Sequence, residues 1–519
     1  MLSRTFAGAV QGIEAQKIII EVHAGGAVPL SAIGYYLVGL PDNAVREGYH
    51  RIISAIKSIG LRIPRIKIVI NLAPADVRKE GSLYDLPIAI GMLHSTEQIE
   101  APEVEQYMMM GELALDGTIR PIKGALSIAI KAKKEGFKGI ILPQQNALEA
   151  AIVEGLEVLA AENLKEVVDF FQEDTPLRRV YLDPQELFAE KNGMYHVDFS
   201  DVKGQGNIKR ALEIAAAGGH NVILIGPPGS GKTMLARRLP TILPPLTLDE
   251  ALETTKIHSV AGKLLSGSAL LTQRPFRSPH HTISDVALVG GGSNPHPGEI
   301  SLAHNGVLFL DELPEFKRAV LEVLRQPMEE RKVTISRAKI SLDYPAGFML
   351  VASMNPCPCG YYNHPDKECA CGPGVVKRYL NKISGPLMDR IDLHVEVTPV
   401  SYDELSTRTF TSEKSKTIAQ RVVSARARQE QRFHNDPTVF NNAQMPSRMV
   451  RELCQLNEES LTLLKTAMEK LQLSARAYDR IIKVARTIAD LGGSEDIQVD
   501  HIAEAIHFRT LDRENWVQN

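Results

Sequence analysis

Residues 221–233 read NVILIGPPGSGKT, and they decide the fold of the middle of the chain. An apolar run typical of a buried strand leads into the pattern G-x-x-x-x-G-K-[ST], and helix-forming residues follow it. In this pattern the glycines let backbone N–H groups close around phosphates, Lys232 neutralises their charge, and Thr233 offers a hydroxyl to Mg²⁺. We therefore predict a loop that binds ATP and Mg²⁺, the alternative being a simple glycine-rich turn. The residues of this loop are Gly226, Pro227, Pro228, Gly229, Ser230, Gly231, Lys232 and Thr233.

A second apolar run, residues 307–312, reads VLFLDE and ends in two carboxylates. Beside a phosphate loop, Asp311 would complete the Mg²⁺ shell and Glu312 would polarise the attacking water. Taken alone, two acids at the end of a strand could equally cap the next helix. Together the two motifs predict an ATPase.

The composition is ordinary for a globular protein, with 519 residues of which 44% are hydrophobic and 23% charged. This length predicts two or three domains. A formal net charge of −3 argues against a chain that coats nucleic acid through overall positive charge, although a local basic channel is compatible with it. The first residues lack the pattern of a secretory signal and no apolar run is long enough to cross a bilayer, so we expect a cytoplasmic protein.

The first part of the chain, residues 1–172, alternates short β-rich runs with helical patterns, which predicts an α/β domain. The clearest β runs are residues 17–22 and 67–70, and helices are expected to begin near Asp42, Tyr84 and Ile122.

The rest of the chain divides into three further segments. Residues 173–194 carry prolines and charges without periodicity and are expected to be a linker. Residues 195–400 form a second α/β domain around the phosphate loop. Residues 401–519 are expected to be helical, with helices over 458–471 and 475–491 and a last helix capped by Asp500.

Four of the five cysteines are crowded into residues 356–374, in the runs Cys357-Pro-Cys359-Gly and Cys369-Ala-Cys371-Gly. Four thiolates on two tight turns can surround Zn²⁺ tetrahedrally, although a one-residue spacer is less typical than C-x-x-C. We expect structural zinc, the alternatives being reduced free cysteines or His364 in place of one thiolate. Cys454 has the place of an ordinary cysteine on a helix face.

These motifs make the chain resemble the AAA+ superfamily. The resemblance implies that residues 351–355 (VASMN) correspond to sensor 1, so that Asn355 helps to place the lytic water. Residues 384–393 (SGPLMDRIDL) resemble the element that carries the arginine finger in the branch including MCM helicases and magnesium chelatases. Arg390 would then act on ATP bound to the neighbouring subunit, and a site completed in this way implies a homohexameric ring.

A second arginine motif, Ser474-Ala-Arg476, resembles sensor 2, so Arg476 would touch the γ-phosphate from a helical lid. The plainer interpretation of both arginines is a solvated or ion-paired residue on a helix.

Two insertions resemble elements that project into the pore of ring helicases in this branch. Residues 284–300 resemble a helix-2 insert, and residues 332–342 alternate around a basic tip, as in a presensor-1 hairpin. Arg337 and Lys339 at that tip would contact the DNA phosphate backbone without reading sequence. The alternative is an exposed hairpin with solvated charges.

Residues 274–284 (RPFRSPHHTIS), 354–360 (MNPCPCG) and 474–480 (SARAYDR) occur together in order, and their combination closely resembles the ComM/YifB proteins, magnesium-chelatase-like AAA+ ATPases of bacteria. The resemblance implies a hexameric, ATP-driven branch-migration helicase that acts on single-stranded and branched double-stranded DNA. Such a motor promotes integration of incoming DNA by homologous recombination in natural transformation, with recombination proteins as further partners. The alternatives are a magnesium-chelatase motor subunit and a Lon-like ATP-dependent protease. Arg277, His280 and His281 would serve the pore, a subunit contact or the local structure.

The first domain resembles the Lon-protease-like fold, of the ribosomal protein S5 domain 2-like type, over residues 79–89 and 111–124. Active Lon enzymes need a serine nucleophile and a lysine base. The corresponding places hold Asp85 and Ser127, with Ser82 about one turn away. We therefore expect no peptidase activity, and a role for this domain in ring assembly or substrate handling.

Overall fold

The computed structural model describes residues 1–27, 34–173, 175–191, 195–264, 267–292, 295–337, 340–362, 364, 367–399, 412–436 and 438–509. The chain forms two compact units, one comprising Met1–Lys191 with Leu248–Thr272 and the other Asn192–Thr247 with Gln273–Asn519. Within the described part of the chain, no helix is both long and apolar enough to span a membrane.

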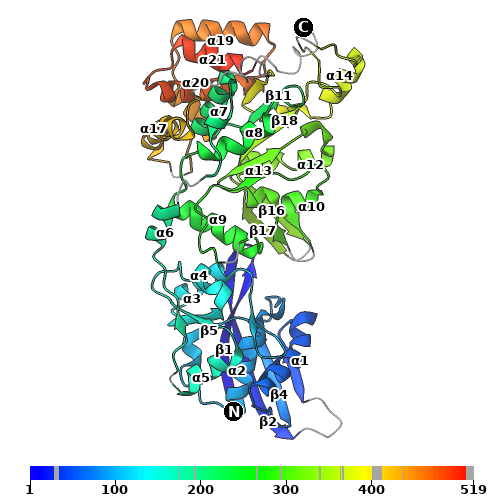
Figure 1. Ribbon diagram of the computed structural model, residues 1–519, viewed down its shortest axis with the longest axis vertical. Helices are drawn as coiled ribbons and strands as arrows, with labels where there is room; N and C mark the ends of the chain where they lie inside the picture. The colour runs from blue at the N-terminus through cyan, green and yellow to red at the C-terminus, as the bar shows by residue number, and fades with distance from the viewer. Residues whose placement is uncertain are drawn as a thin grey trace. The chain divides into compact units, whose positions relative to one another are not determined.

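The first unit is an α/β structure around one sheet, whose described strands follow the order β10-β9-β8-β5-β1-β2-β4-β3 (Figure 1). The strands of this unit are β1 (Leu2–Gln11), β2 (Glu14–Ala27), β3 (Tyr35–Val38), β4 (Ile66–Ala73), β5 (Tyr107–Met109), β6 (Glu112–Leu113), β7 (Ile119–Arg120), β8 (Gly139–Pro143), β9 (Glu157–Ala161) and β10 (Arg178–Arg179), of which β6 and β7 form a separate antiparallel pair. Its helices are α1 (Asn43–Ser58), α2 (Asp85–Ser95), α3 (Ala125–Lys134), α4 (Gln144–Ala150), α5 (Leu164–Glu173), α6 (Pro184–Lys191) and α9 (Leu248–Val260).

The strands and helices predicted from sequence in this unit coincide with elements of the structure. The β runs predicted at 17–22 and 67–70 lie in β2 and β4, which pair antiparallel. The helix predicted near Asp42 is α1, and the Asp42 side chain accepts the N–H of Val45 at 2.9 Å as an N-cap. The helices predicted near Tyr84 and Ile122 are α2 and α3. These elements are confirmed.

Two segments are arranged differently from the boundaries expected from the sequence. Residues 178–179 and 184–191, within the expected linker, form β10 and α6. Asp183 followed by proline is an N-cap signal, and the Asp183 carboxylate accepts the N–H of Gln185 at 2.8 Å. Leu248–Thr272, placed by sequence in the ATPase domain, belongs to the first unit. There α9 packs on α3, and Ser259 accepts the N–H of Gly124 at 3.3 Å through its carbonyl.

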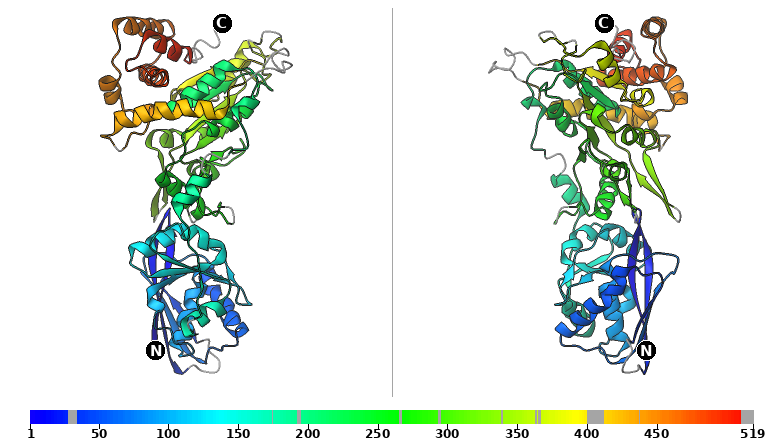
Figure 2. Two further views of the ribbon diagram at one scale, coloured as in Figure 1. Left: turned by 60° about the vertical axis from the view of Figure 1, so that its left-hand side comes forward. Right: turned by 90° about the vertical axis from the view of Figure 1, so that its right-hand side faces the viewer.

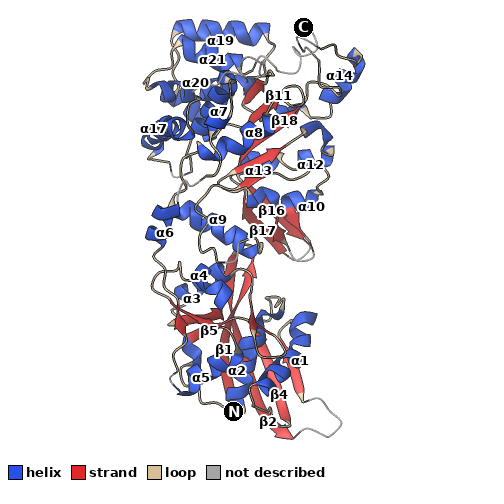
Figure 3. Cartoon of the chain, viewed as in Figure 1, coloured by secondary structure: helices blue, strands red, loops and turns tan. Residues whose placement is uncertain are grey.

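The second unit has a parallel sheet in the order β12-β15-β18-β11-β19, flanked by helices (Figure 3). Its first part comprises α7 (Gly206–Gly218), β11 (Val222–Ile225), α8 (Lys232–Arg238), β12 (Phe276–Arg277), α10 (Asp285–Val289), β13 (Gly290–Gly291), β14 (His296–Pro297), α11 (Glu299–Leu302), β15 (Val307–Leu310), α12 (Arg318–Glu322), α13 (Arg325–Glu330), β16 (Lys332–Arg337), β17 (Ile340–Pro345), β18 (Met349–Met354), α14 (Pro373–Leu380), α15 (Gly385–Met388) and β19 (Leu393–Glu396).

This strand order determines which loops meet. The central strands β11, β15 and β18 are buried along their whole length, as expected of parallel strands covered on both faces. Because β18 lies between β11 and β15, the residues that follow the three strands gather at one edge of the sheet.

The remainder of the second unit is helical, with α17 (Ser415–Phe433), α18 (Ser447–Leu453), α19 (Glu458–Lys470), α20 (Ala475–Gly492) and α21 (Val499–His507). The helices predicted over 458–471 and 475–491 are α19 and α20. The prediction that Asp500 caps the last helix is wrong by two residues: Gln498 is the N-cap of α21, and Asp500 lies in its first turn. The predicted α/β fold class with a helical C-terminal part is confirmed.

Candidate active site

The phosphate loop joins β11 to α8, and two features explain its glycines. A Cβ on Gly226 would overlap the carbonyl oxygen of Val397, so the loop can follow this path only with glycine there. Gly229 and Gly231 have φ values of 79° and 85°, in the left-handed region that glycine adopts without strain. The conformation of the loop therefore depends on glycine at these three positions.

Lys232 lies inside this loop, with only 8% of the residue exposed. Its Nζ donates to the carbonyls of Gly226 and Pro227 at 2.7 and 2.9 Å, and to Asn355 Oδ1 at 3.2 Å. Burial lowers the pKa of Lys232, and the charge of Asp311 opposes that shift. The structure thus brings together the lysine and the amide that the sequence predicted as partners in one site.

Asp311 follows β15 and is held by three donors. Thr233 Oγ1 donates to Oδ2 at 2.8 Å, and the backbone N–H of Glu312 donates to Oδ1 at 3.1 Å. The hydroxyl of Ser353 on β18 also donates to Oδ1. The sequence predicted the pairing of Thr233 with Asp311 around Mg²⁺, but it gave Ser353 no role.

Glu312 is set differently from its neighbour. Its φ is 53°, its N–H is bonded to Asp311, and its carbonyl accepts the N–H of Glu315 at 2.8 Å. The side chain is 59% exposed, and Oε2 lies 3.6 Å from Nδ1 of His281. A positive φ on a residue other than glycine is characteristic of functional sites. Sequence analysis missed His281 as a neighbour of Glu312.

A residue outside the motif, Gln205, also contacts the phosphate loop. Gln205, which precedes α7, has a φ of 56°, and its Nε2 donates to the carbonyl of Ser230 at 2.8 Å. Such a side chain ties the start of α7 to the middle of the phosphate loop. The only sequence signal for it is the glycine on each side of Gln205.

The two predicted arginines make no hydrogen bond to the phosphate loop among the described residues. Arg390 is 7% exposed, donates to the carbonyl of Pro386 at 2.7 Å and pairs with Glu329. Arg476 is exposed in the first turn of α20, whose N-cap is Ser474. Their roles remain predictions.

Arg480, one turn further along α20, joins the helical part to the parallel sheet. It donates to the carbonyl of Arg390 at 3.1 Å and pairs with Asp392. Asp392 also accepts the N–H of Asn221 at 3.0 Å, directly before β11, and lies 3.6 Å from His220. Burial alone would raise the pKa of Asp392, but Arg480 and His220 hold it well below its usual range.

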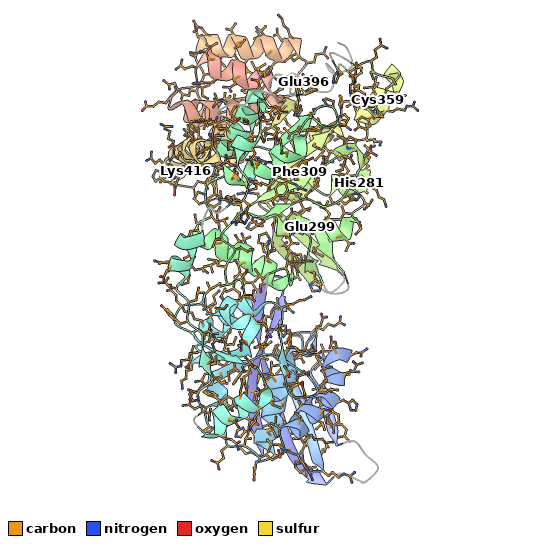
Figure 4. The ribbon with its side chains drawn as sticks, viewed as in Figure 1. His281, Glu299, Phe309, Cys359, Glu396 and Lys416 are labelled. Atoms are coloured by element: carbon orange, nitrogen blue, oxygen red, sulfur yellow. The ribbon has the colours of Figure 1, made fainter. Side chains whose placement is uncertain are left out.

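The four clustered cysteines converge as the sequence predicted, and Figure 4 labels one of them, Cys359. The Sγ atom of Cys357 lies 3.2 Å from that of Cys359 and 3.7 Å from that of Cys369, and the last two are 3.5 Å apart. With Cys371 the ligand atoms all fall within 4.8 Å of one another. Sulfur atoms around tetrahedral Zn²⁺, with bonds of about 2.3 Å, are about 3.8 Å apart. The cluster could therefore hold a metal ion.

The two predicted insertions form short elements in the second unit (Figure 2). The first contains α10, β13, β14 and α11, and the second is the antiparallel hairpin β16–β17. Arg337 is the last residue of β16, and Lys339 lies outside the described residues. The two insertions touch, because Tyr344 on β17 donates its hydroxyl to the carbonyl of Pro295 at 2.7 Å.

In the first unit, the places compared with the Lon nucleophile and base are occupied in other ways. Asp85 is buried and pairs with Arg51 at 2.7 Å, and burial raises its pKa to about 6. Ser127 donates to the carbonyl of Ile13 at 2.7 Å. Ser82 donates to the carboxylate of Glu112.

Comparison with known proteins identifies the parts of the chain. Residues 20–146 match the family described as subunit ChlI of Mg-chelatase, residues 198–405 match magnesium chelatase, subunit ChlI, and residues 412–509 match its C-terminal family. Lon protease 2 of Bacillus subtilis is 31% identical over 157 residues, which are 28% of this chain and 27% of that protein.

Several relatives match along nearly the whole length, among them two from Escherichia coli and Haemophilus influenzae. The YifB protein of Escherichia coli is 45% identical over 512 residues, covering 99% of this chain and 98% of that protein. The competence protein ComM of Haemophilus influenzae is 43% identical over 514 residues, covering 99% of this chain and 98% of that protein. The chain therefore belongs to the ComM/YifB family of magnesium-chelatase-like AAA+ proteins.

Proposed function

We propose that this protein is an ATPase that drives DNA branch migration as a homohexamer and promotes integration of single-stranded DNA by homologous recombination. The observation that carries the ATPase part is the convergence of Lys232, Thr233, Asp311 and Asn355 at one edge of the parallel sheet. The DNA part rests on the ComM relative, which is named a competence protein.

In this proposal each residue has one task. Lys232 binds the β- and γ-phosphates, while Thr233 and Asp311 hold the metal ion. Mg²⁺ held by Thr233 and Asp311 would neutralise charge that develops on the phosphates during transfer. Glu312 accepts a proton from the attacking water, and Asn355 keeps that water in line. The hydrogen bonds that already join these groups support the assignment.

The charge of the transition state requires an additional cation, which we assign to Arg390 of a neighbouring subunit in a hexameric ring. Arg476 would act from the helical part of the same chain. Native mass measurement with ATP and Glu312→Gln tests the ring: a stable hexamer is expected, and a monomer under all nucleotide conditions would contradict it.

We assign Zn²⁺ to the four cysteines as a structural ion. Their sulfur separations fit a tetrahedral site, and Cys357 is fully buried beside the end of β18. When bound, the ion supplies a cross-link between two turns that have no disulfide. Metal analysis of reduced protein should find about one zinc per chain.

DNA contact is assigned to Arg337 and Lys339 at the end of the β16–β17 hairpin, where they would meet phosphates. The matched control is Lys332, at the base of the same hairpin, which pairs with Asp343 at 3.0 Å. Replacing both tip residues with alanine should weaken DNA binding and lower the salt dependence by about one unit per lost phosphate contact. Lys332→Ala should change neither quantity comparably.

The deciding experiment is a four-way junction assay with ATP, comparing the natural protein with Lys232→Ala. ATP-dependent conversion of the junction by the natural protein alone is expected, together with stimulation of ATP hydrolysis by DNA. Active ATP hydrolysis without junction movement or DNA stimulation would refute the DNA motor and leave the ATPase standing.

That second outcome would favour a magnesium-chelatase motor subunit, a candidate supported by the family matches over residues 198–405 and 412–509. Such a subunit would hydrolyse ATP independently of DNA and require a porphyrin-binding partner. Its signature would be ATP-dependent insertion of Mg²⁺ into a porphyrin when that partner is supplied.

A further inference from the structure

The backbone that carries Arg390 is held by two side chains that are distant in the sequence. Arg390 lies in the turn between α15 and β19, and its carbonyl accepts hydrogen bonds from Asn221 Nδ2 at 3.3 Å and from Arg480 Nη1 at 3.1 Å. Asn221 directly precedes β11, whereas Arg480 belongs to α20 in the helical part. A backbone carbonyl has two lone pairs, so these two donors use both of them.

The residues that follow Arg390 are held by the helical part as well. Arg509, which lies beyond α21 and is 1% exposed, donates from Nη1 to the carbonyl of Ile391 at 2.5 Å. Arg480 also pairs with the carboxylate of Asp392. Two successive carbonyls, at positions 390 and 391, are therefore each bonded to an arginine of the helical part.

Asn221 bonds the same backbone to the parallel sheet. Its Oδ1 accepts the N–H of Leu350 on β18 at 2.8 Å, and its own N–H donates to Asp392 at 3.0 Å. Because Asn221 is bonded to β18 and leads into β11, it is a fixed anchor for the carbonyl of Arg390. The bond from Arg480 is the one that changes when α20 moves relative to the sheet.

The side chain of Arg390 depends on the position of this backbone. Its Nη1 donates to the carbonyl of Pro386 at 2.7 Å and its Nη2 pairs with Glu329, while Nε is buried without a hydrogen-bond partner among the described residues. Arg390, Glu329 and Arg480 line one cavity of about 530 Å³. A catalytic group displaced by about 1 Å can lose about 100-fold in rate, so a small shift of the backbone is enough to remove the guanidinium from a phosphate.

We propose that Arg480 is a positioning residue for Arg390, so that the helical part of each chain determines whether its arginine reaches the ATP of the next subunit. With α20 in place, Arg480 holds the carbonyl and the guanidinium is presented to the neighbouring site. When α20 moves, the carbonyl loses one of its two donors and the guanidinium leaves that position. The inference rests on the proposed action of Arg390 in a ring, and it adds that Arg480 acts on the neighbour's ATP rather than on that of its own chain.

A purely structural role for Arg480 would be to neutralise Asp392, and two substitutions address the two roles. Arg480→Met removes both the charge and the donors. Arg480→Lys keeps a counter-charge for Asp392, but its nitrogen ends one bond closer to the backbone than the guanidinium nitrogens do. Since an ammonium bonds a carboxylate more strongly than a neutral carbonyl, the lysine should serve Asp392 and lose the bond to Arg390.

The test uses rings mixed from two kinds of chain, with native mass measurement to show that mixed rings form. One kind carries Lys232→Ala, so it binds no ATP but presents Arg390; the other carries Arg390→Ala, so it binds ATP but needs an arginine from its neighbour. Neither kind should hydrolyse ATP alone, and an equal mixture should do so. In the Lys232→Ala chain, Arg480→Met should lower the kcat of the mixture about tenfold and Arg480→Lys about threefold or more, with KM for ATP within about twofold because the ATP-binding chain is unaltered.

The matched control is the same pair of substitutions in the other chain. There Arg390 is already replaced and Arg480 has no arginine to position, so Arg480→Lys should leave the kcat of the mixture within about twofold. An equal loss in both placements, or no loss in either, would overturn the inference and leave the trans action of Arg390 standing. Absence of hydrolysis in the mixture without any Arg480 substitution would instead refute the action of Arg390 on a neighbour, and this inference with it.

Discussion

Ser353→Ala should weaken the metal dependence of ATP hydrolysis although the residue need touch neither nucleotide nor metal. Ser353 lies on the buried strand β18, is 0% exposed, and donates its hydroxyl to Oδ1 of Asp311. The other carboxylate oxygen, Oδ2, faces Thr233 at 2.8 Å. Removal of the hydroxyl takes away one of the three donors that hold Asp311, so the carboxylate is held less firmly in the position in which it serves the ion.

Two independent magnitudes give the size of the effect. A hydrogen bond to a charged group contributes about 1.5–3 kcal/mol, and about 1.4 kcal/mol corresponds to a tenfold change in affinity, so the loss is about 10-fold to 150-fold. Replacement of groups that orient metal ligands generally lowers metal affinity or activity about 10-fold to 100-fold. The ranges agree, and we expect the half-saturating Mg²⁺ concentration to rise by at least about tenfold.

The assay is the initial rate of ATP hydrolysis against free Mg²⁺ at saturating ATP. Ser353→Thr is the control, since it keeps the hydroxyl on a residue that strands accommodate, and it should stay near the natural curve. An Mg²⁺ curve for Ser353→Ala within about twofold of the natural one, from protein that binds ATP, would refute the reasoning.

Three further perturbations test other parts of the second unit. Cys359→Ser should abolish the stoichiometric zinc that we expect metal analysis to find in the natural protein, and retention of one zinc per chain would exclude the four-cysteine site. Gly360→Ala should weaken ATP binding about tenfold or more in equilibrium titration, because φ is 84° and the new Cβ would lie 2.5 Å from Pro228 Cδ in the phosphate loop. Arg480→Ala should destabilise the unit by about 3–5 kcal/mol in urea unfolding, since Asp392 would stay buried without its main counter-charge. Asp392 has a depressed pKa, so its stabilising contribution is present above the unfolded-state pKa and is lost as pH falls; Arg480→Ala should reduce that acid-dependent loss.

The phosphate loop and the carboxylates at 311 and 312 could be predicted from sequence because their signals are local. In both cases an apolar run determines a buried strand, and the reactive residues follow that strand directly. The same logic located Asn355 at the end of β18. Their convergence depends on strand order, which the register of β11, β18 and β15 displays.

Ser353 and His281 could not be found in that way. Every residue of β18 is buried, so the strand lacks the alternation that would show which side chains face Asp311. His281 lies 31 positions before Glu312, in a segment whose motif indicated only a family. The membership of α9 in the first unit was hidden for a related reason, since sequence continuity favoured the neighbouring ATPase segments over the distant partner α3. The positions of Ser353, His281 and α9 all depend on contacts between residues that are far apart in the sequence.

The distribution of charge supports a site completed by a second subunit. The groups that would bind the metal, the phosphates and the water meet within one chain, at Lys232, Asp311 and Asn355. The two arginines expected to neutralise the transition state do not bond to that loop among the described residues, and Arg390 is held by Glu329 of its own chain. Arg390 is nearly buried but the Glu329 side chain is 57% exposed, so this ion pair can be broken at modest cost when another anion replaces the carboxylate. The γ-phosphate of a neighbour's ATP is such an anion, so exchange of Glu329 for phosphate would make ring assembly and nucleotide binding mutually dependent.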